Sequence, residues 1–227
     1  MDMLFALFNL IYFLLGYLLL HRYSFNDGTA SDSVGGTAYT GTLIGGATVN
    51  NMQAMIATSA QKIFFPAGLL GSYKAISVET WVTTAASQAA WATLFQFGPS
   101  ASINDVNTFY VNMCSGSACN WNKFNLGWVE SFYQNHRLSS TAVQFGGQTN
   151  MHVVYTVKQD DYARLYLNGA LAATSSSIFS PLPPVNLFYL GCGSCDNFVG
   201  SVNELRMWGM LLSAADISLR YSQGPSK

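Results

Sequence analysis

The sequence predicts an all-β protein: a two-sheet antiparallel β-sandwich (jelly roll), with one short C-terminal helix and an N-terminal apolar helix. Composition favours strands, because Tyr, Phe and Thr are common while only 9% of the 227 residues are charged. Alternation of apolar and polar residues recurs after residue 20. In "AISVETWV", Ile76, Val78 and Val82 share one face, and Glu79 and Trp81 share the other. A tryptophan on the second face predicts that both faces are covered, as in a sandwich.

The first element is an apolar run, "MLFALFNLIYFLLGYLLL", over residues 3–20. As a helix it would be about 27 Å long, close to the hydrocarbon thickness of about 30 Å. It lacks an early Lys or Arg and an Ala-x-Ala cleavage site, which a signal peptide would favour. An uncleaved membrane anchor, a cleaved signal and a partly buried strand over residues 17–20 all remain open. We therefore divide the chain into an apolar segment, 1–17, and one β-sandwich domain, 18–227.

Turn and cap signals place the later elements. Asn168-Gly169 lies between "RLYL" and "ALAAT", and this dipeptide suits a hairpin turn with positive φ at both central residues. Asp160-Asp161 separates two other alternating segments and predicts a second turn. In "LSAADISLRY", Ser213 and Asp216 have the spacing of a capping box, which predicts a short helix near the C-terminus.

Four stretches carry a family resemblance: "LHRYSFNDGTASDSVGGTAYTGTLIGGATV", "ISVETWV", "MHVVYTVKQDDYARLYLNGALAAT" and "LFYLGCGSCDNFVGSVNELRMWGMLLSAADISLRY". In this order they resemble a laminin-G-like jelly roll of the concanavalin A-like lectin and glucanase superfamily, from about residue 18 to 224. The resemblance implies two curved sheets packed face to face, with the first and last strands adjacent. It also implies mostly non-catalytic roles in carbohydrate binding or adhesion, often beside a structural calcium.

The opening loop is the predicted calcium site. Asp27 and Asp32 stand in "NDGTASDS", where carboxylates and flexible glycine-rich backbone could supply the oxygen ligands that calcium takes. The resemblance places Asn203 and Glu204 of the last strand nearby. Many relatives carry Asp at the position of Asn203, so one charge fewer should weaken the site. The alternative is that both aspartates only form Asx-turns.

The four cysteines form two local pairs, Cys114 with Cys119 and Cys192 with Cys195. Their even number and the apolar N-terminus favour disulfides in an oxidising compartment. Free thiols and a four-thiolate zinc site remain open alternatives, because both spacings suit zinc.

The acidic residues do not form a hydrolase motif. A glycosidase needs two carboxylates about 5–9.5 Å apart, and the related glucanases carry Glu-x-Asp-x-x-Glu on one strand. Glu79, Glu130 and Glu204 have no acid two residues away. Glu130 stands among aromatic residues, and pairing in space remains open. The three histidines are far apart in the sequence, and no nucleophile motif is present. We therefore expect no enzymatic activity.

A binding role fits the remaining features. Trp121, Trp128 and Tyr133 cluster in "NWNKFNLGWVESFYQNH", where aromatic rings could stack on sugars or simply pack in the core. Lys and Arg are scattered and the net charge is −1, which argues against a nucleic-acid partner. We expect a glycan-binding or adhesion module at an extracellular, cell or particle surface, secreted or membrane-anchored. A structural protein that binds another protein is the first rival, and a glycoside hydrolase the second.

Overall fold

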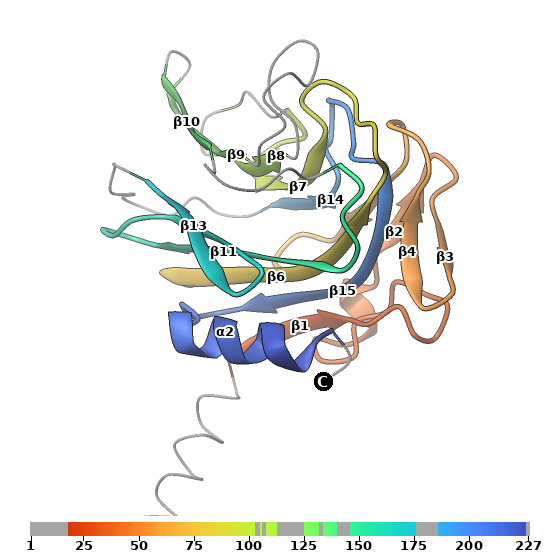
Figure 1. Ribbon diagram of the computed structural model, residues 1–227, viewed down its shortest axis with the longest axis horizontal. Coiled ribbons are helices and arrows are strands. Elements are labelled where there is room, and N and C mark those ends of the chain that lie inside the picture. The colour runs from red at the N-terminus through yellow and green to blue at the C-terminus, as the bar shows by residue number, and fades with distance from the viewer. Residues whose placement is uncertain are drawn as a thin grey trace, which may run out of the picture.

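The computed structural model describes residues 18–102, 105, 108–112, 125–131, 134–139, 146–175 and 186–225, with the backbone alone for 125–131 and 134–139. Two antiparallel sheets pack face to face, and a helix covers the outer face of one of them (Figure 1). The predicted β-sandwich with a short C-terminal helix is therefore confirmed. The predicted apolar segment, 1–17, lies outside the described residues. No helix in the described ranges is long and apolar enough to cross a membrane.

The first sheet has eight strands in the order β13-β12-β11-β6-β15-β4-β3, and β1 also pairs with β15. The pairing of β1 with β15 confirms the expected adjacency of the first and last strands. The strands are β1 (Leu19–Tyr23), β3 (Thr48–Asn50), β4 (Gln53–Ile56), β6 (Ala75–Thr84), β11 (Met151–Lys158), β12 (Arg164–Leu167), β13 (Ala170–Thr174) and β15 (Gly200–Trp208).

The second sheet has seven strands in the order β10-β9-β8-β7-β14-β5-β2. They are β2 (Thr42–Ile44), β5 (Lys62–Phe65), β7 (Thr93–Gly98), β8 (Phe109–Asn112), β9 (Asn125–Ser131), β10 (Gln134–Ser139) and β14 (Leu187–Leu190). A short 3-10 helix, η1 (Thr37–Tyr39), follows the opening loop. Strands β5, β14 and β7 are neighbours in this sheet although they are distant in the sequence, and they carry the candidate site.

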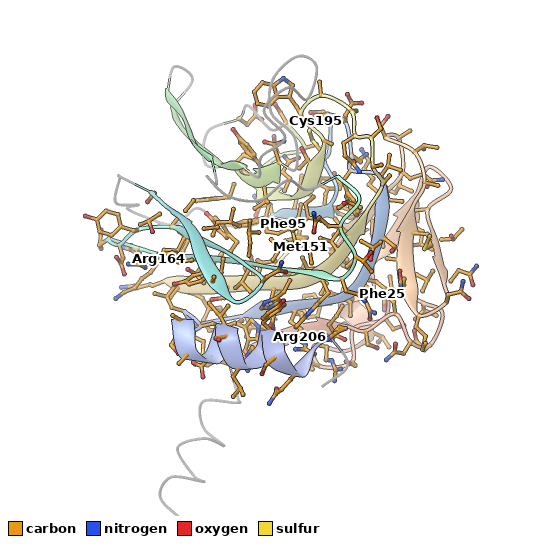
Figure 2. All side chains as sticks on the ribbon, viewed as in Figure 1. Phe25, Phe95, Met151, Arg164, Cys195 and Arg206 are labelled. Carbon is orange, nitrogen blue, oxygen red and sulfur yellow. A yellow bond between two sulfur atoms is a disulfide. The ribbon has the colours of Figure 1, made fainter. Side chains whose placement is uncertain are left out.

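The core fills the space between the sheets. Its centre is aromatic: the rings of Phe97 and Phe188 stack with centroids 5.9 Å apart, and the Tyr155 ring meets Phe97 edge-on at 5.8 Å. Every residue from Ile76 to Val82 in β6 is buried, so the sheet is covered on both faces as the position of Trp81 predicted. Figure 2 shows Phe95 and Met151 between the two sheets.

Helix α2 (Ala214–Gln223) covers the outer face of the eight-stranded sheet (Figure 1). Ile217 packs there with Val154, Trp208 and Leu212 in a second, smaller apolar cluster. The predicted capping box is confirmed, because the Ser213 hydroxyl accepts the Asp216 N–H and the Asp216 carboxylate accepts the Ser213 N–H. These paired bonds satisfy two amide groups that would otherwise lack a partner at the helix start.

Both predicted turns are confirmed. Asn168 and Gly169 have φ values of 49° and 78° between β12 and β13, as the tight hairpin requires. Asp160 has a φ of 60° between β11 and β12, and the Asp161 N–H donates to the Lys158 carbonyl.

Candidate functional site

An aromatic pair lies on the outer face of the seven-stranded sheet. Phe65 and Phe188 point into the core, so the neighbouring residues Phe64 and Tyr189 point the other way. They are register partners across β5 and β14, and their ring centroids are 5.3 Å apart. Both remain partly exposed. We call Lys62, Phe64 and Tyr189 the platform, because Lys62 lies on the same face of β5.

The platform belongs to a row of register partners that crosses the seven-stranded sheet. Tyr189 also pairs with Gln96 of β7, and Gln96 pairs with Tyr110 of β8. Gln96 and Tyr110 are 0% and 1% exposed, whereas Thr42, opposite Phe64 on β2, is exposed. The outer face therefore opens toward the β2 edge of the sheet.

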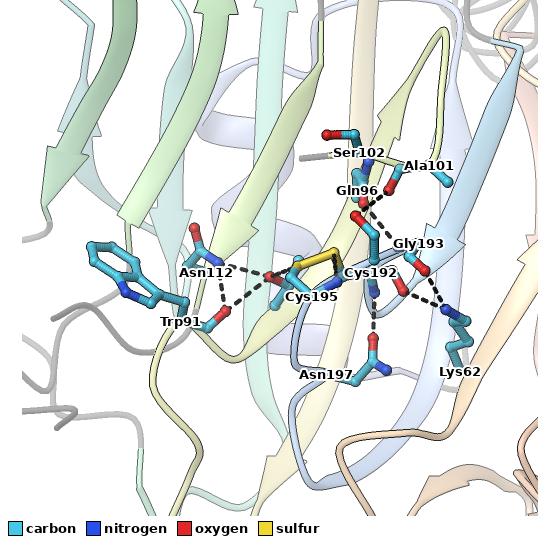
Figure 3. Close-up of a disulfide and its surroundings, with 12 residues drawn as sticks. Lys62, Trp91, Gln96, Ala101, Ser102, Asn112, Cys192, Gly193, Cys195 and Asn197 are labelled. Carbon is cyan, nitrogen blue, oxygen red and sulfur yellow. Dashed lines mark hydrogen bonds between the residues drawn. A yellow bond between two sulfur atoms is a disulfide. The ribbon is translucent and has the colours of Figure 1, made fainter. Parts of the chain in front are cut away.

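Lys62 is fixed by the loop after β14. Its ammonium Nζ donates to the Cys192 carbonyl at 3.0 Å and to the Gly193 carbonyl at 2.5 Å (Figure 3). It also lies 5.5 Å from the centroid of the Tyr189 ring, within cation–π range. Burial lowers the pKa of Lys62 and raises the pKa of Tyr189. The cation therefore lies at the edge of an aromatic surface in a partly dehydrated position.

The loop that holds Lys62 contains a disulfide between Cys192 and Cys195, as predicted for this pair. The Asn197 carboxamide oxygen accepts the Cys192 N–H, and its nitrogen donates to the Ser59 carbonyl at 2.6 Å. The Gly193 N–H donates to the Gln96 side chain at 2.9 Å. The disulfide and these bonds fix the carbonyl groups that position Lys62. Cys114 and Cys119, the other predicted pair, lie outside the described residues.

On the other side of the disulfide lies a buried carboxamide, Asn112. Its nitrogen donates to the Trp91 carbonyl at 2.9 Å and to the Thr93 hydroxyl at 2.7 Å (Figure 3). No residue in the described ranges offers a hydrogen bond to its Oδ1. Trp91 has a φ of 60°, an uncommon conformation for a non-glycine residue.

The predicted calcium ligands Asp27 and Asp32 have different environments. Asp27 is exposed, and its Oδ1 accepts the N–H and the hydroxyl of Thr29 in an Asx-turn. Asp32 is buried beside His21, with Oδ2 2.5 Å from Nδ1, while its Oδ1 accepts three backbone N–H groups. Burial alone would raise the pKa of Asp32, but the hydrogen bonds from His21 and these N–H groups lower it.

Glu204 is adjacent to β1 as expected, but its charge is neutralised there. Arg22 Nε lies 2.6 Å and Arg206 Nε 3.1 Å from Glu204 Oε1. Asn203 lies at a register shift of β15 and is partly exposed. The described residues contain no cluster of three His, Cys, Asp or Glu side chains suited to a metal ion. Asp32 and Glu204 thus have other partners in this structure, and calcium binding by Asp27, Asp32, Asn203 and Glu204 stays a prediction.

A third buried carboxylate, Glu79, lies under α2. His152 Nε2 is 3.1 Å from Glu79 Oε1, and Arg206 Nη1 is 3.6 Å from Glu79 Oε2. Arg220 of the helix reaches Glu79 Oε2 at 4.0 Å. Glu79 and Glu204 are 0% and 1% exposed, so both carboxylates are neutralised in the interior.

Of the aromatic residues predicted from the sequence, one lies near the opposite edge of the same sheet, and the other two are not described. Trp128 belongs to β9, where its backbone pairs with Phe109 of β8 and His136 of β10. Trp121 and Tyr133 lie outside the described residues. Sequence reasoning missed the platform, although the alternation in "KIFF" and "LFYL" marked Phe64 and Tyr189 as aromatic residues on the face opposite Phe65 and Phe188.

The sequence matches the family described as the Concanavalin A-like lectin/glucanases superfamily over residues 57–218. The chain belongs to this superfamily. The matched residues include the whole platform and the disulfide loop. No curated protein matches the sequence closely enough to suggest a function by sequence similarity.

Solved structures with this superfamily architecture confirm the fold. Domain 4 of AbnA, an extracellular GH43 arabinanase from Geobacillus stearothermophilus solved with arabinotriose, is 20% identical with a TM-score of 0.64. The alignment covers 88% of this chain and 96% of that one. A botulinum neurotoxin type C structure, described as entering cells through two ganglioside molecules, is 12% identical with a TM-score of 0.69.

The Trypanosoma rangeli sialidase, solved as a covalent intermediate with 2,3-difluorosialic acid, is 14% identical with a TM-score of 0.68. The alignments cover 92% and 91% of this chain, but 52% of the neurotoxin chain and 33% of the sialidase chain. At these identities the similarity establishes the fold alone, and the ligands and activities of those proteins are not assigned to this chain.

Proposed function

We propose that this chain is a non-catalytic carbohydrate-binding module, and that the platform is its glycan-binding surface. The observation that carries the proposal is the partly exposed pair Phe64 and Tyr189 on the outer face of the seven-stranded sheet. Sugar rings present apolar C–H faces that stack on aromatic rings, and the Tyr189 hydroxyl and the Lys62 ammonium add polar contacts at the edge.

The rigidity of the platform supports a binding role. Phe64 and Tyr189 come from paired strands whose other faces are fixed in the core by Phe65 and Phe188. A surface that is already ordered loses little conformational entropy when a ligand binds. Binding modules gain affinity from such preorganisation.

The environment of the glutamates favours binding over hydrolysis. A glycosidase needs two carboxylates that face the substrate at about 5–9.5 Å from one another. Glu79 and Glu204 instead bind Arg206 on the face covered by α2, in the sheet opposite the platform. Neither carboxylate therefore faces the platform.

The disulfide supports an oxidising compartment. A disulfide between Cys192 and Cys195 persists in oxidising environments such as the cell exterior. We extend the proposal to an extracellular, cell or particle surface, with residues 1–17 as an anchor.

A glycan array with the full chain, purified in mild detergent, tests the proposal. We expect binding to a restricted set of glycans and a loss of affinity of about tenfold or more for Phe64→Ala and Tyr189→Ala. Tyr162→Ala is the matched control, since Tyr162 is a 39% exposed tyrosine on the opposite sheet's β11–β12 connection. Absence of binding to any glycan contradicts the proposal and favours a protein-binding role. Release of reducing sugar from a bound glycan would instead identify a hydrolase.

A further inference from the structure

The described acidic residues do not balance the charge of Lys62. Its two hydrogen-bond acceptors are the neutral carbonyl groups of Cys192 and Gly193. Among the described residues, no carboxylate lies within ion-pair distance of its ammonium group. Partial burial also removes water from this cation and lowers its pKa, so its solvation is incomplete.

Within the described part of the chain, one donor of Lys62 is left for a ligand. An ammonium group has three N–H donors, and the loop carbonyls accept two of them. Because the disulfide and Asn197 fix those carbonyls, the direction of the remaining donor is restricted. The ammonium also lies 5.5 Å from the Tyr189 ring, so a ligand stacked on this ring would bring its substituents next to the cation.

We propose that the platform selects anionic glycans, with the carboxylate of an acidic sugar paired to Lys62 while a sugar ring stacks on Phe64 and Tyr189. The inference rests on the proposed glycan binding at this surface and names its ligand class. A carboxylate would restore the charge balance and form a charge-assisted hydrogen bond, which is stronger than one between neutral groups. A neutral sugar gains the stacking contact alone.

The test compares ligands that differ in charge and little else. Calorimetry on the full chain would measure the affinity for oligogalacturonate against its methyl ester, and for sialyllactose against lactose. We expect at least one acidic ligand to bind about tenfold tighter than its neutral counterpart. Sulfated lactose is included to separate a preference for carboxylate from a preference for any anion. Equal or stronger binding of the sulfated sugar would overturn the carboxylate assignment.

The variant Lys62→Met removes the charge and keeps most of the side-chain length. We expect it to reduce the acidic-to-neutral affinity ratio to about one, while Lys62→Arg retains most of the preference. Melting temperatures of both variants would show whether the disulfide loop stays folded. If Lys62 only supports the loop, Lys62→Met will lower the melting temperature and leave the ratio unchanged, which overturns the inference.

The outcomes also separate this inference from the proposed function. Equal affinity for acidic and neutral ligands overturns the anionic preference but leaves glycan binding intact. If none of these acidic and neutral ligands binds, and the glycan array also shows no binding, both the anionic preference and the proposed glycan binding are overturned. An acidic preference that persists in Lys62→Met overturns the role of Lys62.

Discussion

At the residue scale, some buried polar groups have a hydrogen-bond partner and others have none among the described residues. Tyr23 and Tyr155 are both almost fully buried aromatic residues. The Tyr23 hydroxyl donates to the Tyr39 carbonyl at 2.9 Å, whereas no described residue offers a partner to the Tyr155 hydroxyl. Burial raises the pKa of Tyr155 well above its ordinary value, so the group stays neutral. The two tyrosines therefore form a natural comparison.

We expect Tyr155→Phe to stabilise the protein and Tyr23→Phe to destabilise it. Leaving a buried hydroxyl unpaired costs about 1–3 kcal/mol, and a satisfied hydrogen bond contributes about 1 kcal/mol. Tyr155→Phe removes the unpaired group and keeps the ring contacts with Phe97. Thermal unfolding should give a melting temperature about 2–4 °C higher for Tyr155→Phe and lower by a similar amount for Tyr23→Phe. A drop for Tyr155→Phe would show that its hydroxyl has a partner, such as a buried water.

At the element scale, the opening loop is held by local hydrogen bonds as well as by the buried side chains of Phe25 and Ala30. The loop between β1 and η1 is held by Asp32, which binds His21 and three backbone N–H groups. His21 Nε2 lies 2.7 Å from the Leu69 carbonyl and so connects the loop to a distant segment. Asp27 lies at the exposed tip of the loop, where it could still contribute to a cation site.

Calcium binding by this loop should be weak and should depend on Asp27. With one exposed carboxylate and backbone carbonyls as ligands, we expect a dissociation constant of about 1 mM, as in extracellular calcium modules. Calcium at tenfold that concentration would stabilise the fold by about 1.4 kcal/mol, a shift of about 3–5 °C. Melting curves in about 10 mM calcium and in chelator would measure this shift, and Asp27→Asn should abolish it. Equal melting temperatures in both conditions would show that the loop does not bind calcium and that Asp27 forms only an Asx-turn.

Helix α2 is fixed to the sheet by buried charges as well as apolar contacts. Arg206 reaches Glu204 and Glu79 and also donates to the Pro225 carbonyl at 2.7 Å, just beyond the helix (Figure 2). Its guanidinium lies 5.0 Å from the centroid of the Trp81 ring. Removing this cation would leave Glu204 with Arg22 alone among the described residues and would take from Glu79 the nearer of its two arginines.

We expect Arg206→Ala to destabilise the protein by about 3–5 kcal/mol, the usual cost of breaking a buried ion pair. The matched control is Arg164→Ala, because Arg164 pairs with Asp161 at 3.5 Å in a position that is about 28% exposed. Exposed pairs contribute about 1 kcal/mol or less. Chemical denaturation of the two variants would measure the difference. Similar losses would show that the buried network adds little to stability.

The sequence predicted the elements better than their contacts. Asn168-Gly169 and the Ser213–Asp216 capping box were predictable because each is a local signal of a few residues. The platform was not predictable from the sequence. Lys62 and Cys192 are 130 residues apart, and the order of strands in a sheet cannot be deduced from alternation alone. The opening aspartates illustrate the same limit, since Asp32 interacts with His21 and backbone amides that no spacing rule indicates.

At the scale of the whole molecule, the first strand and the platform belong to opposite sheets. β1 begins at Leu19, directly after the apolar segment, and pairs with β15 in the eight-stranded sheet. The platform lies on the outer face of the seven-stranded sheet, beyond the core. If residues 1–17 insert into a bilayer, this arrangement presents the platform away from the membrane surface.

We therefore expect the full chain to remain with liposomes after alkaline carbonate extraction and still to bind the glycan found in detergent, with an affinity within about twofold. Ile11→Lys with Leu14→Lys is the control, since each lysine in the apolar run should cost about 2.5–3.5 kcal/mol of insertion and release the protein. Extraction of the wild-type chain by carbonate would contradict the anchor. Retention in the membrane with loss of glycan binding would contradict the orientation, because the platform would then face the lipid instead of the solvent.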